Sequence, residues 1–316
     1  MSSNPLKIRI GTRASKLAMV QSTEVKALLI AQNNIPEDQI EIVPITTSGD
    51  KIQDRNLAEI GGKGLFIKEL EEALIQNRID IAIHSAKDVP PFLHEKTKIS
   101  AFTTRLNPQD CLISKKFNSL KEIPEGSVVG TSSARRKSIL LRLRPDLKII
   151  NFRGNVDTRL NKIDNGVAEA SILAVCGLER LGKEKLIKEE IPTTTMLPAG
   201  GQGSLIIQTR KDDNSISSIV RKINNSEAEI CVGSERVFLQ ELEASCSTPV
   251  AVYASISENK LNLKTMIIDY DGKEIFETSQ IGDVNIESGR ELAINASRKT
   301  KTEATQLLER ICNDIS

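Results

Sequence analysis

The chain has 316 residues, of which 39% are hydrophobic and 27% are charged, a balance that is typical of globular proteins. Its 43 lysine and arginine residues nearly cancel its 42 aspartate and glutamate residues, which excludes a chain kept disordered by net charge. The length excludes a single small domain and predicts two or three domains.

Neither an export signal nor a membrane span is predicted. The N-terminus lacks an apolar signal core, and no stretch approaches the roughly 18 apolar residues that a span requires. Five cysteines, an odd number, lie at least 15 residues apart, which fits neither a disulfide framework nor C-x-x-C metal spacing. We therefore expect a cytoplasmic protein without a metal site.

Two series of alternating strand and helix patterns predict an α/β fold with mainly parallel sheets. The first series contains helical patterns at 15–33 and 64–77. The turn-rich stretch 103–110 and the Gly- and Pro-rich stretch 197–204 are candidate crossings between two lobes with a cleft between them. The predicted strands of both series are 7–12, 41–46, 79–84, 111–114, 127–131, 148–152 and 170–174.

The last part of the chain has a different pattern. A helix at 227–243 precedes three strand-like runs, at 249–255, 261–268 and 274–279, and a closing helix at about 288–312. Polar turns between the runs predict a small α+β domain with a three-stranded antiparallel sheet. The predicted domains are 1–104 with 204–222, 105–203 and 226–316.

Positive charge is concentrated between Thr131 and Lys162, with nine basic and two acidic residues. For any one of these residues, a solvated helix face is the simpler interpretation. Arginine and serine, however, recur where predicted strands pass into helices, and ligands of open α/β sheets bind at such places, where helix N-termini also favour anions. These residues are Arg13, Ser15, Ser133, Arg135, Arg136, Arg153 and Arg159.

An anion site is therefore predicted, and arginine suits carboxylate or phosphate groups because its guanidinium binds them through two hydrogen bonds. Nucleic acid is the rival ligand. It is disfavoured because only 3% of the residues are aromatic and none is tryptophan, so few side chains could stack on bases.

Lys87 and Asp88 follow an apolar strand that two prolines stop, which places them on the same rim as the arginines. An aspartate there could stabilise a developing cation or move a proton, and Lys87 would keep it ionised. The alternative is an aspartate that only forms the turn. We assign His84 to the packing of the strand.

A glycine-rich loop and a cysteine turn complete the candidates. The loop at 61–64 does not match the phosphate-binding motif, so we interpret it as a loop that places Lys63 over a cleft. Cys246 lies in the small polar turn A-S-C-S-T-P, where a thiol could be a nucleophile or an attachment point. The alternative is an incidental exposed thiol.

Several stretches, in order and over nearly the whole chain, resemble the porphobilinogen deaminase family, also called the hydroxymethylbilane synthase family. Besides the Cys246 turn, they are R-I-G-T-R-A-S-K-L-A (9–18), G-G-K-G-L-F-I-K-E-L-E (61–71), D-I-A-I-H-S-A-K-D-V-P (80–90), G-T-S-S-A-R-R (130–136), F-R-G-N-V-D-T-R-L (152–160) and L-P-A-G-G-Q-G (197–203).

The resemblance implies a transferase of tetrapyrrole (porphyrin and heme) biosynthesis. Such an enzyme joins four porphobilinogen molecules head to tail, releases ammonia at each step, and frees hydroxymethylbilane by hydrolysis. It implies a dipyrromethane cofactor held by a thioether to Cys246, and two lobes like those of periplasmic binding proteins beside a third domain. It also implies a monomer whose partner is porphobilinogen, rather than nucleic acid or a membrane.

The resemblance also implies a role for each candidate residue. Asp88 would be catalytic, stabilising the cation that remains when ammonia departs. The residues at the cofactor would be Cys246, Lys87, Asp88, Ser133, Arg135 and Arg136. Those that bind the carboxylates of substrate and product would be Arg13, Ser15, Lys63, Arg153, Arg159 and Arg180.

One departure from the family's pattern lies at the anchor. Gly-Gly or Gly-Ser often precedes the cysteine, whereas Ala244 and Ser245 stand here, and alanine would strain a position with positive φ. Two alternatives stay open. One is a non-enzymatic two-lobed binder of small carboxylates, which gives Cys246 and Asp88 no joint task, and the other is a homologue that builds the cofactor but turns over slowly.

Overall fold

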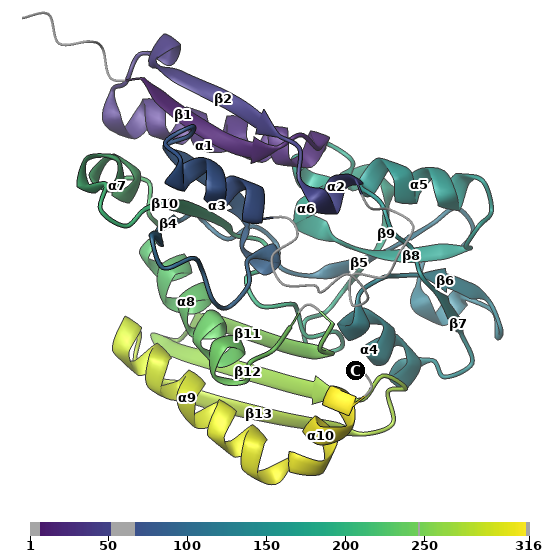
Figure 1. Cartoon of the computed structure of the whole chain (residues 1–316). Coiled ribbons are helices and arrows are strands. Elements are labelled where there is room, and N and C mark those ends of the chain that lie inside the picture. Colours follow the sequence, from purple (N-terminus) through teal and green to yellow (C-terminus); the bar gives the residue numbers. More distant parts are fainter. Residues whose placement is uncertain (1–6, 52–66, 246, 314–316) are drawn as a thin grey trace, which may run out of the picture.

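The computed structural model describes residues 7–51, 67–245 and 247–313. Its strands form two five-stranded sheets and one three-stranded sheet. We call the regions built on the two larger sheets the first and second lobes, and the region built on the third sheet the C-terminal region. Figure 1 shows helices flanking each sheet, with α9 and α10 at one end of the molecule.

The first lobe has the strand order β2-β1-β3-β10-β4. β1 is parallel to β2 and β3, whereas β10 is antiparallel to both of its neighbours. Helix α1 begins after Ser15 and buries Val25 and Leu29 against the sheet. The elements are β1 Ile8–Arg13, α1 Lys16–Asn33, β2 Ile40–Ile45, α2 Ser48–Lys51, α3 Lys68–Ile75, β3 Ile81–Ser85, β4 Thr97–Phe102, β10 Leu205–Arg210 and α7 Asn214–Arg221.

The second lobe repeats this plan with the order β7-β6-β8-β5-β9. β6 is parallel to β7 and β8, and β5 is antiparallel to β8 and β9. Asn155 begins α5 by accepting a hydrogen bond from Thr158 N at 2.8 Å. The elements are β5 Asp110–Ser114, β6 Val128–Gly130, α4 Ala134–Leu143, β7 Lys148–Ile150, α5 Val156–Asp164, β8 Ala170–Ala174, α6 Val175–Arg180 and β9 Ile187–Ile191.

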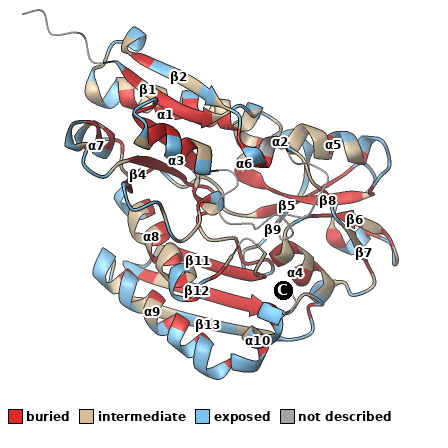
Figure 2. Cartoon of the chain, in the orientation of Figure 1, coloured by how far each residue is buried: buried red, intermediate tan, exposed pale blue. Residues whose placement is uncertain are grey.

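The C-terminal region is an antiparallel sheet of β11, β12 and β13 with helices packed on it. Its core includes Phe238 of α8, Leu261 and Leu263 of β12, and Ala293 of α9. Figure 2 shows the buried residues along the strands and a largely exposed outer face of α9. The elements are α8 Ser226–Glu241, β11 Val250–Ser257, β12 Lys260–Ile268, β13 Ile275–Gly282, α9 Ile286–Glu303 and α10 Thr305–Asn313.

The predicted α/β class and the three-stranded antiparallel sheet are confirmed, with three differences in detail. Each large sheet is mixed, because the strand that follows a crossing between the lobes, β5 or β10, enters antiparallel to its neighbours. The predicted closing helix is two helices, interrupted at Ala304. Strands β4 and β9 were not predicted. Among the helices of the described ranges, none is both long and apolar enough to cross a membrane.

The two crossings between the lobes lie against each other and against the turn after β3. A β-carbon at Gly203, whose φ is +102°, would lie 2.4 Å from Leu106 O. One at Gly201, whose φ is +79°, would lie 2.7 Å from the Ala86 β-carbon and 3.0 Å from Lys87 N. Glycine is therefore required at both positions, by conformation and by space. The close approach brings both crossings to the turn that carries Asp88.

Candidate active site

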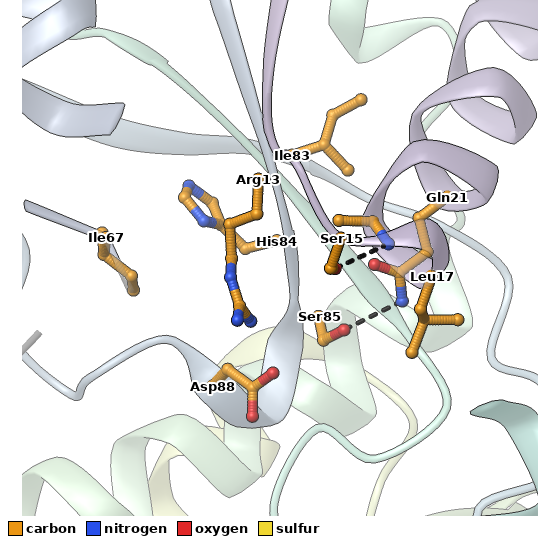
Figure 3. A pocket seen from close by; sticks show the side chains of 10 residues that line it. Arg13, Ser15, Leu17, Gln21, Ile67, Ile83, His84, Ser85 and Asp88 are labelled. Carbon is orange, nitrogen blue, oxygen red and sulfur yellow. Dashed lines mark hydrogen bonds between the residues drawn. The ribbon is translucent and has the colours of Figure 1, made fainter. Parts of the chain in front are cut away.

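One pocket lies at the carboxyl ends of β1 and β3. Its lining includes Arg13, Ser15, His84 and Asp88. The two strands are parallel neighbours, so their ends open at the same edge of the sheet. Figure 3 shows the Arg13 guanidinium pointing toward the Asp88 carboxylate. The fold thus brings together three candidate residues, Arg13, Ser15 and Asp88.

Ser15 and Ser133 are the N-terminal caps of helices in different lobes. Ser15 Oγ accepts a hydrogen bond from Ala18 N at 3.3 Å, and Ser133 Oγ accepts one from Arg136 N at 3.4 Å. Each hydroxyl also carries a proton that it can donate to a ligand. The caps fix both hydroxyls beside helix N-termini, where anions are favoured.

Arg135 and Arg136 converge on one carboxylate, that of Asp110 at the start of β5. Asp110 Oδ2 accepts from Arg135 Nη2 at 2.7 Å, and Oδ1 accepts from Arg136 Nη2 at 2.6 Å and Nε at 3.0 Å. Burial alone would raise the pKa of Asp110, but the charges of the two arginines outweigh it and hold the pKa well below its usual range. This carboxylate, 0% exposed, stays ionised.

Lys87 joins the same cluster through Gln202 of the return crossing. Lys87 Nζ donates to Gln202 Oε1 at 3.1 Å, and Gln202 Nε2 donates to Asp110 Oδ1 at 3.0 Å. Burial lowers the pKa of Lys87, and the charge of Arg136 lowers it further. A cation from the first lobe therefore lies close to two cations of the second.

Arg159 and Arg153 extend the positive charge along α5 and its approach. Arg159 Nε donates to Gly154 O at 2.9 Å. Burial and the charges of Arg136 and Arg153 together lower the pKa of Arg159 to about 10, while the charge of Asp88 opposes the decrease. Arg136 and Arg153 are thus close enough to Arg159 to destabilise its positive charge. Asp88 is close enough to offset part of this repulsion.

Arg180 has a different environment from the other candidates. Its Nε donates to Glu24 on α1 at 2.9 Å, and its Nη2 donates to Gly203 O at 3.4 Å. Arg180 therefore links the second lobe to the first lobe and to the return crossing.

The anchor candidate, Cys246, and the loop candidate, Lys63, lie outside the described residues. The flanks of Cys246 are described, and Ala244 is buried in the core of the C-terminal region. The residue with positive φ is Glu243, at 54°, and Ala244 is not among the positive-φ residues. Ala244 is therefore not strained, and the residue of this turn with the unfavourable positive φ is Glu243.

The sequence did not identify three residues of the candidate site as functional. Asp110 and Gln202 were not singled out, although an aspartate opening an apolar strand implies a buried charge that needs a partner. His84 was assigned to packing; it is buried and bonds Gln208 Oε1 through Nε2 at 2.9 Å, yet it also lines the pocket of Arg13 and Asp88.

Comparison with protein families assigns most of the chain. Residues 8–218 match the family model described as "Porphobilinogen deaminase, dipyromethane cofactor binding domain", and residues 229–301 match "Porphobilinogen deaminase, C-terminal domain". The chain belongs to the porphobilinogen deaminase family. The resemblance inferred from the sequence stretches is thereby confirmed.

Curated relatives agree with this assignment. The porphobilinogen deaminase of Nitrobacter hamburgensis is 43% identical over 296 residues, covering 92% of this chain and 94% of the relative. That of Nitrobacter winogradskyi is 45% identical and covers 86% of each chain. Among solved structures, the methionine-binding protein MetQ covers 70% of this chain and 90% of its own, with 16% identity and a TM-score of 0.43.

The described residues fit the dipyrromethane cofactor of this family. Arg135 and Arg136 share the single carboxylate of Asp110, and Lys87 is linked to it through Gln202. Arg135 Nε is a buried donor without a partner among the described residues. Buried cations in excess over anions are costly unless a ligand supplies negative charge. A dipyrromethane built from porphobilinogen supplies it, because each pyrrole carries two carboxylates.

Proposed function

We propose that this chain is a transferase that joins four porphobilinogen molecules head to tail on a dipyrromethane primer attached to Cys246, releases ammonia at each step, and frees hydroxymethylbilane by hydrolysis. The observation that carries the proposal is the excess of positive charge around one exposed carboxylate. Arg13 shares a pocket with Asp88, and the charge of Asp88 acts on both Arg159 and Lys87.

The cations would bind the acetate and propionate groups of cofactor, substrate and growing product. A hydrogen bond to a charged group contributes roughly 1.5–3 kcal/mol net, so a few such contacts hold a polycarboxylate firmly. We assign Arg135, Arg136, Lys87 and Ser133 to the cofactor, and Arg13, Ser15, Arg153 and Arg159 to the substrate and product. Lys63 and Arg180 complete the substrate set.

Asp88 would act on the pyrrole that loses ammonia. The departure leaves positive charge on the substrate, and a carboxylate in the pocket stabilises that charge as it develops. After the new carbon–carbon bond forms, a proton leaves the coupled pyrrole, and Asp88 can accept it. The cofactor, when bound, supplies the nucleophilic pyrrole carbon at which the product chain begins.

Domain limits, compartment and oligomeric state are part of the proposal. We propose domains at 1–104 with 204–222, 105–203 and 226–316, supported by the three sheets and the two crossings. We also propose a cytoplasmic monomer. The odd number of cysteines and their spacing of at least 15 residues support a reducing compartment.

Intact mass spectrometry of the chain from cells that make porphobilinogen tests the proposal. We expect an excess equal to two porphobilinogen units less two ammonia molecules. Cys246→Ser should abolish it, whereas Cys312→Ser, which changes an exposed cysteine on α10, should retain it. A bare wild-type mass would contradict the proposal and favour the carboxylate-binding alternative. A loaded chain that releases no product would favour the slow homologue.

A further inference from the structure

Asp110 occupies a junction between the lobes. It opens β5, directly after the first crossing, and its side chain faces Arg135 and Arg136 from α4. Gln202 reaches it from the return crossing, and Lys87 reaches Gln202 from the turn after β3. One carboxylate therefore connects four segments that are distant in the sequence.

The hydrogen bonds leave each group in the cluster little freedom to turn. Arg135 Nη1 donates to Leu197 O at 2.7 Å, and Arg136 Nη1 donates to Ile172 O at 3.1 Å. Gln202 Nε2 also donates to Pro108 O at 2.7 Å, which fixes its amide so that Oε1 faces Lys87. Each arginine is thus held by the Asp110 carboxylate and one backbone carbonyl, and Lys87 is held by the Gln202 amide.

We infer that Asp110 is a positioning residue for the cofactor site, orienting Arg135 and Arg136 directly and Lys87 through Gln202. The inference rests on the proposed function, since it concerns the side chains assigned there to the dipyrromethane. Without the carboxylate, two neighbouring guanidinium groups repel each other in a buried place and lose their common orientation. The cofactor carboxylates would then meet cations that are displaced from their binding geometry.

A second buried carboxylate in the same protein provides a matched control. Asp80 precedes β3, is 7% exposed, and accepts hydrogen bonds from Arg9 Nη2 at 2.9 Å and Arg210 Nη2 at 3.1 Å. It therefore resembles Asp110 in burial and in holding two arginines. It lies at the opposite end of β3 from Asp88, and neither of its arginines is assigned to a ligand.

The experiment compares Asp110→Asn with Asp80→Asn, since both remove a charge and keep the shape. Each variant and the wild type are purified from cells that make porphobilinogen, and the loaded fraction is read from the intact mass. Chains purified without cofactor from cells lacking porphobilinogen are then incubated with it, and the rate of mass gain is recorded. Thermal unfolding midpoints of the cofactor-free chains report the cost to the fold.

We expect Asp110→Asn to slow loading by about tenfold or more, because at least one charge-assisted contact to the cofactor is misplaced. Asp80→Asn should lower the unfolding midpoint by a similar amount and load at the wild-type rate. Equal loading by both variants would overturn the inference, and so would a loss that follows the unfolding midpoint in both.

Gln202→Met gives a test that leaves the buried charges in place. It removes the link between Lys87 and Asp110 while Asp110 keeps both arginines, so we expect loading slower than wild type but faster than in Asp110→Asn. If Asp110→Asn does not fold, Gln202→Met tests the inference by itself. Loading of Gln202→Met at the wild-type rate would then contradict the inference. A bare wild-type chain would overturn the proposed function and the inference together, whereas a variant that loads at the wild-type rate beside a loaded wild type would overturn the inference alone.

Discussion

Asp80 and Asp110 are each buried and each hold two arginines, yet their surroundings differ in charge. Around Asp80, Arg9 and Arg210 are balanced by two carboxylates, because Arg210 Nη2 also donates to Asp213 Oδ2 at 2.6 Å. Around Asp110, one carboxylate faces two arginines directly and a lysine through Gln202. A balanced cluster stabilises the fold, whereas an unbalanced one is suited to an anionic ligand.

The same contrast holds at the two ends of β3. Asp80 precedes the strand, and burial, which would raise its pKa, is outweighed by the hydrogen bonds from Arg9 and Arg210, so its pKa lies below the ordinary value. Asp88 follows the strand, is exposed, and lines the pocket with Arg13. In α/β sheets ligands bind at the carboxyl ends of strands, which is the end where the charge is unbalanced.

Asp88→Asn offers the largest expected effect. Asparagine forms turns as readily as aspartate, so the turn after β3 should persist while the negative charge is lost. We expect the cofactor mass to be retained and turnover to fall by about 10²-fold or more, the usual contribution of a positioned acid or base. Asp80→Asn is the control and should keep normal turnover. Near-normal turnover of Asp88→Asn would show that this residue only forms the turn.

The buried His84 makes the stability of the fold depend on pH. Burial, together with the charges of Arg236 and Arg13, lowers its pKa to about 4 against the opposing hydrogen bond to Gln208. Protonation is thus easier in the unfolded chain, whose histidine pKa is about 6.5, so stability decreases as the pH falls from about 6.5 to 4. The loss should reach roughly 3 kcal/mol.

Urea unfolding at pH 7 and at pH 4.5 measures this dependence. His84→Gln should lose less free energy of unfolding between the two pH values than the wild type does. His94→Gln, which changes the exposed second histidine, is the control and should follow the wild type. If the two variants showed the same dependence, the acid sensitivity would belong to other groups.

Arg159→Leu should have the smallest effect and separates ligand binding from folding. Arg159 donates one hydrogen bond to Gly154 O, and we assign the rest of its guanidinium to substrate and product carboxylates. Removing one such contact should raise KM for porphobilinogen by about tenfold. Arg9→Leu makes the same change in the balanced cluster and should lower the unfolding midpoint without changing KM. Unchanged KM in Arg159→Leu would remove Arg159 from the substrate site.

Much of the architecture could be predicted because hydrophobic periodicity is a local signal. Residues 170–174 were predicted as a strand and form β8, and both crossings were located by their turn-forming composition. β4 and β9 were missed, since their residues alternate too weakly to distinguish a strand from a loop. β9, for example, reads I-K-E-E-I, and its two adjacent glutamates interrupt the alternation of apolar and polar residues.

The sequence alone determined which loop tips carry charge, because the order of strands, turns and helices fixes that Arg13, Asp88 and Arg153 follow strands. Only the tertiary structure decided which charges are balanced. Arg135 and Arg136 meet Asp110 from 25 and 26 positions away, and Arg180 meets Glu24 from the other lobe. Ion pairs between distant segments depend on how the sheets pack and where the crossings run, and no local pattern of residues encodes that.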